Sequence, residues 1–93
     1  MRKFLIERHV PNVGQMDRNQ LRAAAAKSNQ VLADLAPNLS WQQSFVADDH
    51  FFCIYFATDA DMVRRHAELA GFAADRVIEI RRTIDPATGG PKS

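Results

Sequence analysis

The chain of 93 residues contains one cysteine, Cys53, which excludes an internal disulfide and leaves no Cys-x-x-Cys pair for zinc or thiol exchange. Long apolar runs are also missing: the run after Arg2 and Lys3 ends at Glu7, too early for a signal peptide or a membrane span. The formal net charge is only +1, and no basic stripe of the kind that follows phosphates is present. We therefore expect a cytoplasmic protein that binds neither nucleic acid nor membranes.

Familiar catalytic signatures are missing too. The sequence has no Gly-x-Ser-x-Gly turn, no glycine-rich phosphate loop and no His-Glu-x-x-His helix. Spacing alone singles out no serine as a nucleophile. A site has to be inferred instead from where ionisable side chains fall relative to the predicted core.

Hydrophobic periodicity divides the chain into six elements. Residues 3–10, 41–47, 51–57 and 77–84 have the alternation or the aromatic and β-branched content of strands, while residues 21–35 and 59–70 carry helical apolar stripes. The order β-α-β-β-α-β predicts an α+β, ferredoxin-like fold, a four-stranded antiparallel sheet with two helices on one face. Right-handed crossovers place the first and third strands at its centre.

The ends of these elements carry local signals. Asp17 and Gln20 form a capping-box pattern before the first helix, Thr58 is placed to cap the second helix, and Gly71 suits its C-terminal end. After Ile84 the chain has too little apolar content to pack. We expect one domain over residues 1–86 and a flexible tail over residues 87–93.

Both faces of the predicted sheet are apolar, although two helices cover only one of them. A monomer would expose an apolar patch larger than soluble monomers usually carry. We therefore expect a homodimer in which two sheets face each other, like a dimeric α/β barrel. The predicted contact consists of Ile6, Phe52, Ile54 and Ile80.

Ionisable side chains interrupt these apolar segments, and burying them unpaired is costly. His66 shares the apolar stripe of the second helix with Val63, Ala67 and Ala70, so it should point at the sheet. We expect the sheet to present Leu5 and a set of polar side chains to the helices. The predicted ligand pocket consists of Glu7, Cys53, Tyr55, His66 and Glu79.

Binding of a divalent metal ion is the first function that is compatible with this pocket. An imidazole and two carboxylates suit a hard or borderline ion such as nickel or zinc. We expect His66, Glu7 and Glu79 as ligands, with Cys53 or His9 as additional ones.

Two alternatives remain open. One is a cofactor-free enzyme of the dimeric α/β-barrel kind, a monooxygenase or isomerase, in which His66 is a general base and Tyr55 orients a small organic substrate. The other is a dimeric scaffold that buries a closed Glu-His network. His9 and His50 are expected to be solvated, one near a strand end and one in a turn.

Some motifs extend over nearly the whole chain. They are Phe4-Leu5-Ile6-Glu7-Arg8, Trp41-Gln42-Gln43-Ser44, Phe52-Cys53-Ile54-Tyr55, His66 with Ala70-Gly71-Phe72, and Asp75-Arg76-Val77-Ile78-Glu79 with Ile84-Asp85-Pro86. These motifs resemble a short bacterial domain-of-unknown-function family that is often labelled nickel-binding protein. The resemblance implies a ferredoxin-like fold and dimerisation. Cys53, His66 and Glu79 match the family pattern, while Glu7-Arg8-His9 stands where metal-binding members carry an Asp-x-His arrangement.

Overall fold

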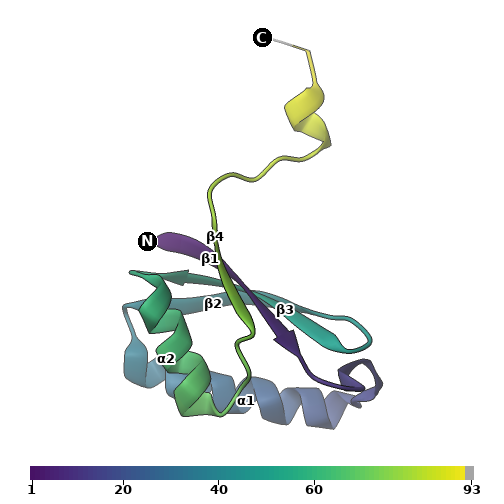
Figure 1. The fold of residues 1–93 in the computed structure, drawn as a ribbon, viewed down its shortest axis with the longest axis vertical. Helices are drawn as coiled ribbons and strands as arrows, with labels where there is room; N and C mark the ends of the chain where they lie inside the picture. The colour runs from purple at the N-terminus through teal and green to yellow at the C-terminus, as the bar shows by residue number, and fades with distance from the viewer. Residues whose placement is uncertain (92–93) are drawn as a thin grey trace.

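The computed structural model describes residues 1–91, and its elements follow the predicted order. The strands are β1 (Arg2–His9), β2 (Leu39–Val46), β3 (His50–Ala57) and β4 (Arg76–Ile80); the helices are α1 (Arg18–Leu35) and α2 (Ala60–Ala70), with two short 3-10 helices, η1 (Val13–Gln15) and η2 (Pro86–Gly89). The C-terminal segment extends away from the sheet and the two long helices (Figure 1). Within residues 1–91 no helix is long and apolar enough to cross a membrane.

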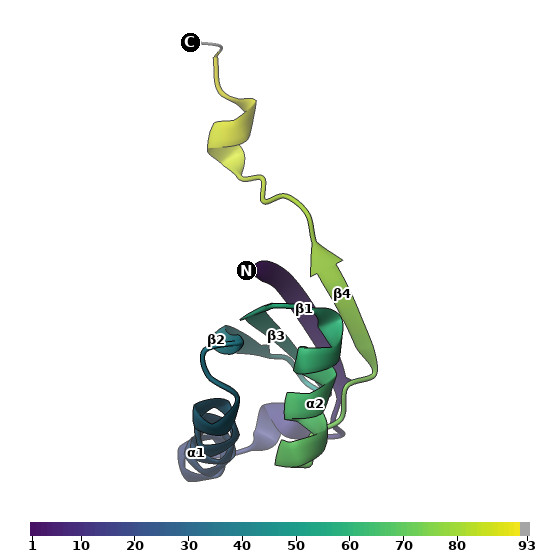
Figure 2. The same ribbon diagram turned by 90° about the vertical axis from the view of Figure 1, so that its left-hand side faces the viewer.

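The four strands form one antiparallel sheet in the order β2-β3-β1-β4. This order confirms the ferredoxin-like topology and the central positions of β1 and β3. Both long helices lie on the same side of the sheet (Figure 2). We call the other side, which no helix within residues 1–91 covers, the open face.

The helix ends follow local chemistry, with one departure from the prediction. The Asp17 side chain accepts a hydrogen bond from the Gln20 backbone N–H at 2.8 Å, and the Asp17 backbone N–H donates to the Gln20 side chain at 2.9 Å, so the capping box is complete. Gly71 ends α2 at a φ of 75°, a left-handed conformation that favours glycine. The cap of α2 is Asp59 rather than Thr58, because the Asp59 carboxylate accepts from the Met62 N–H at 2.9 Å.

The alternation of β1 decides which side chains face the helices. Phe4, Ile6 and Arg8 are buried on the helix side, with exposed fractions of 1%, 0% and 3%. The register with β3 agrees, since Ile6 stands opposite the buried Cys53 and directly paired residues share a face.

The predictions that Leu5 and Glu7 face the helices and that Ile6 lies on the open face are therefore wrong. Side chains alternate between the two faces along a strand, so assigning one residue to the wrong face places all other residues of that strand on the wrong face as well. The choice rested on giving the buried His66 ionisable partners from the sheet, whereas the structure places Ser28 of α1 against His66. Phe52, Ile54 and Ile80 do lie on the open face.

Strand β4 ends at Ile80, before the predicted end at Ile84. Ile80 pairs with Lys3, so almost none of β1 remains as a partner for a longer β4. Residues 81–91 are exposed throughout, and η2 within them is held by its own Asp85–Thr88 capping box.

The segment after β1 packs tightly against the β2–β3 turn. The Gly14 N–H donates to the Asp48 carbonyl at 2.9 Å, and the Val10 N–H donates to the Asp49 carbonyl at 2.9 Å. A Cβ at position 14 would lie 2.7 Å from the Ala47 carbonyl oxygen, closer than such atoms approach. Glycine is therefore required by the approach of two backbones at this point.

The tail can be tested by truncation. Removal of residues 87–93 should change the free energy of unfolding by less than about 0.5 kcal/mol, because nothing described after Pro86 is buried. Urea unfolding of the full and shortened chains checks this. Truncation from Val77, which removes β4, should by contrast abolish the cooperative transition; a comparable loss from the short truncation would show that the tail docks on the body.

Candidate functional site

A cavity of about 440 Å³ lies between the sheet and α1. Arg8, Trp41, Phe51, Cys53 and Tyr55 line it from the sheet, and Leu21, Ala24, Ala25 and Ser28 line it from α1. Its volume falls within the range of about 300–1,000 Å³ usual for small-molecule pockets. Of the predicted pocket residues, the cavity therefore brings together Cys53 and Tyr55.

The cavity exists because α1 is incompletely packed. Ser28 is the single buried residue among the 18 residues of this helix. Leu32 and Leu35 pack against the core at the C-terminal end, whereas Leu21 and Ala24 border the cavity. The N-terminal part of the predicted apolar stripe thus borders the cavity instead of packing directly on the sheet.

Arg8 provides the charge of the cavity. Its guanidinium donates to the Ala73 carbonyl at 2.6 Å and to the Tyr55 hydroxyl at 3.5 Å, and it lies 5.4 Å from the centre of the Phe72 ring. Within residues 1–91 no carboxylate lies within 4.0 Å of it. The side chain is therefore a buried cation whose protein partners are neutral oxygens and an aromatic face.

His66 is fully buried behind the cavity, as its helical stripe predicted. Its Nε2 lies 3.1 Å from Ser28 Oγ and 3.4 Å from the Ser28 carbonyl oxygen, while its Nδ1 has no hydrogen-bond partner. Burial lowers the pKa of His66 most, the hydrogen bond with the Ser28 backbone offsets part of that effect, and the charge on Arg8 lowers the pKa by a smaller amount. The imidazole is therefore neutral at pH 7.

Tyr55 and Cys53 have more ordinary environments. Burial raises the pKa of the Tyr55 hydroxyl, and the positive charge of Arg8 offsets only part of that effect. The Tyr55 ring packs 5.3 Å from the His66 ring. Cys53 is a free, buried thiol in the core cluster.

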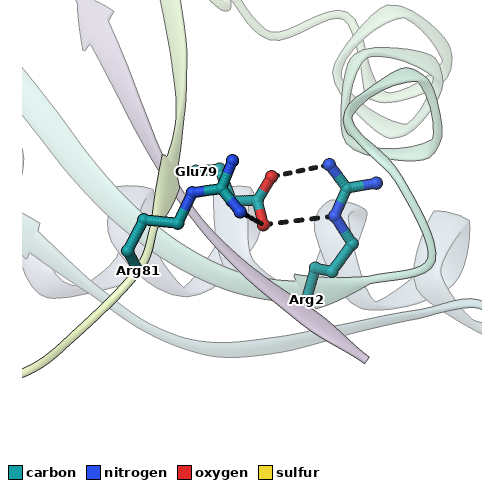
Figure 3. Close-up of polar contacts among 3 residues, drawn as sticks. All are labelled: Arg2, Glu79 and Arg81. Atoms are coloured by element: carbon teal, nitrogen blue, oxygen red, sulfur yellow. Dashed lines mark hydrogen bonds and ion pairs between the residues drawn. The ribbon is translucent and has the colours of Figure 1, made fainter.

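Glu79 belongs to a charge cluster at the sheet edge, shown in Figure 3. Its carboxylate accepts from Arg2 at 2.6 Å and 3.2 Å and from Arg81 at 3.2 Å. The hydrogen bond from Arg2 lowers the pKa of Glu79 most, with smaller contributions from the charges of both arginines. The Glu79 carboxylate, which was predicted to be a metal ligand, is thus bound by two guanidinium groups.

Glu7 lies on the open face with two histidines. Its carboxylate is 3.9 Å from His50 Nε2 and 3.6 Å from the Arg76 guanidinium. The His9 and His50 rings pair directly across β1 and β3, with centroids 4.9 Å apart. We call Glu7, His9 and His50 the open-face cluster.

The predicted metal set of His66, Glu7 and Glu79 is therefore not assembled. Glu7 is on the opposite side of the sheet from His66, and Glu79 is held by arginines. Within residues 1–91 no three His, Cys, Asp or Glu side chains are placed to hold a metal ion. A closed Glu-His network around His66 is wrong for the same reason, because its hydrogen-bond partner is Ser28.

Sequence reasoning missed Arg8 as a site residue and set His50 aside as a turn residue. The alternation of Arg8 with Phe4 and Ile6 was a usable signal, since all three fall on one face of a strand. His50 begins β3, opposite His9, and only the exact hairpin register reveals that pairing.

The chain is similar to known proteins both in sequence and in fold. The family model described as "Nickel responsive protein SCO4226-like" matches residues 4–80. The chain belongs to this family. The match confirms the resemblance drawn from the sequence motifs. No curated protein matches the chain.

A solved structure shares the fold. The crystal structure of SCO4226 from Streptomyces coelicolor A3(2) superposes with a TM-score of 0.75 at 23% identity, covering 88% of this chain and 99% of that one. At this identity the similarity establishes the α+β architecture with its four-stranded antiparallel sheet.

The lowered pKa of His66 predicts how stability depends on pH. The unfolded chain takes up a proton near the ordinary value of 6.5, and the folded chain does so only at lower pH. The wild type should therefore lose stability as pH falls below about 6.5, through the interval down to the folded-state pKa. His66→Gln removes this titration, so it should lose less stability over the same interval.

Urea unfolding at pH 8 and pH 5 tests this difference. At pH 8 His66→Gln should already be less stable, by roughly 1–3 kcal/mol, because a fully buried side chain is replaced. His50→Gln, on the open face, is the control and should follow the wild-type pH dependence. Parallel pH profiles for wild type and His66→Gln would contradict the assignment.

Proposed function

We propose that the protein binds a divalent metal ion, with nickel as the first candidate, through the open-face cluster. The observation that carries the proposal is the juxtaposition of the His9 and His50 rings, 4.9 Å apart, with Glu7 3.9 Å from His50, in a chain of a family described as nickel responsive. This moves the proposed ligands from the helix side of the sheet to its open face.

The chemistry of these side chains fits such an ion. Imidazole nitrogen is a good ligand for nickel and zinc, and a carboxylate adds a negative charge. Glu7 and His9 have an acidic-x-His spacing, with Glu7 in place of the aspartate that the family resemblance associates with metal-binding members. The same cluster contains Arg76, whose 3.6 Å contact with Glu7 would have to give way to a metal.

Glu7, His9 and His50 lie near one another but are not placed as a metal-binding group within residues 1–91, so binding would require their side chains to reorient, with water or a second copy supplying the remaining ligands. We propose that a second copy covers the open face. Phe45 and Ile78 support this, since their exposed fractions are 54% and 37% on a sheet face without helices. Two such faces in contact would bury these side chains, at about 25 cal/mol per Å² of apolar surface.

The dimer predicts a specific effect of charge on the open face. Phe45→Lys and Ile78→Lys should each shift the protein toward monomer, because an ammonium would be buried between the sheets. Light scattering after size exclusion at micromolar concentration measures the mass. Leu69→Lys is the control, since Leu69 is 55% exposed on α2. A wild-type monomer would contradict the proposal.

The metal site predicts loss of binding in two single variants. Calorimetric titration of untagged protein with NiCl₂ or ZnCl₂ should give saturable heats. His9→Ala and His50→Ala should weaken binding by at least about tenfold, since even groups that only support metal ligands contribute about 10–100-fold. His66→Gln should bind as the wild type does.

Other outcomes of that titration are informative. Loss of binding in His66→Gln with retention in His9→Ala would return the metal to the helix side. No saturable heat with either ion would reject metal binding altogether.

A second candidate is a cofactor-free hydrolase, a different chemistry from the monooxygenase or isomerase predicted from the sequence, and one contact favours it. Ser28 lines the cavity and its Oγ lies 3.1 Å from His66 Nε2; in the tautomer that carries its proton on Nδ1, the neutral imidazole would accept the hydroxyl proton. Hydrolysis of p-nitrophenyl acetate that is lost in Ser28→Ala would support this candidate, and an equal rate in both proteins would reject it.

A further inference from the structure

We propose that the cavity between the sheet and α1 binds a small organic monocarboxylate with an apolar body, and that Arg8 holds its carboxylate. The proposal is independent of the metal site. Arg8 and the open-face cluster lie on opposite sides of β1.

The first argument is the charge of Arg8. A guanidinium has five N–H donors, and this one, 3% exposed, uses two hydrogen bonds to the neutral oxygens of Ala73 and Tyr55. A buried charge without a counterion is costly, and the neutral oxygens and the Phe72 ring offset only part of the cost of removing a guanidinium from water. Within residues 1–91 no carboxylate lies within salt-bridge distance. The geometry leaves that partner to a ligand.

The second argument is the set of hydroxyl groups beside Arg8. Tyr55, Ser28 and Ser44 line the same cavity. The Ser44 hydroxyl accepts from Trp41 Nε1 at 2.9 Å, and the Tyr55 hydroxyl accepts from Arg8, so the proton of each hydroxyl is available to donate. A cavity that holds a cation and hydroxyl donors suits an anion rather than a metal ion.

The third argument is the character of the remaining wall. Trp41, Phe51 and Phe72 offer aromatic surfaces, and Leu21 and Ala24 offer aliphatic surface from α1. An aryl or short alkyl group in the 440 Å³ space would cover the stripe of α1 that lacks a packing partner. The single charge of Arg8 matches a monoanion, whereas a phosphate would bring additional charge into an apolar cavity.

Binding in the cavity can be followed by tryptophan fluorescence. Trp41 is the one tryptophan of the chain and lines the cavity, so a bound ligand should change its fluorescence. We would titrate the full chain with phenylacetate, with the neutral phenylacetamide of nearly the same shape, and with inorganic phosphate. Calorimetry provides a second readout that does not depend on Trp41.

Phenylacetate should bind saturably, and phenylacetamide should bind roughly 10- to 100-fold more weakly, the range expected when a charge-assisted hydrogen bond is lost. Arg8→Met, which keeps the apolar length of the side chain, should lose the preference for the acid. Arg22→Met is the matched control on the exposed side of α1 and should keep it.

Each other outcome overturns the proposal. Equal affinity for acid and amide in the wild type would show that Arg8 does not read the carboxylate, even if Arg8→Met failed to fold. Binding of phosphate as tight as that of phenylacetate would show a simple anion site, and absence of saturable binding at millimolar concentration would show no site. Nickel titration of Arg8→Met should be unchanged, which separates this proposal from the metal site.

Discussion

The pairing of β1 with both β3 and β4 is the constraint on which both candidate sites depend. β1 is central in the sheet, so its alternation assigns each of its side chains to the helix side or to the open face. Glu7, Arg8 and His9 are consecutive, yet Arg8 lies on the helix side and the other two lie on the open face. A central strand with partners on both sides cannot slip without breaking two ladders, which keeps this assignment fixed.

The two faces have different chemistry as a result. The helix side holds a cation among aromatic rings and hydroxyl groups, while the open face holds a carboxylate and two imidazoles beside apolar side chains. An anion suits the first environment and a metal ion the second. The positive charge of Arg8 disfavours a second cation on the helix side, even though that side contains a histidine.

Much of the fold could be predicted because its signals are local. The capping box of Asp17 and Gln20, the Gly71 end of α2 and the order of the elements all follow from neighbouring residues. The face of β1 was predicted wrongly although Phe4, Ile6 and Arg8 visibly share one face, because His66 was expected to need Glu7 and Glu79 as buried partners. His66 was correctly placed toward the sheet by its helical stripe, but its Ser28 partner lies on another helix, at a distance that periodicity does not encode.

The backbone contact at Gly14 sets a limit on what the cavity can accept. Val10 and Met16 line the cavity on either side of this glycine in the sequence, and Val46 lines it just before the β2–β3 turn. Because two main chains touch there, this end cannot widen by side-chain rotation. If the proposed ligand binds here, a longer one would have to extend toward Phe72 and the end of α2.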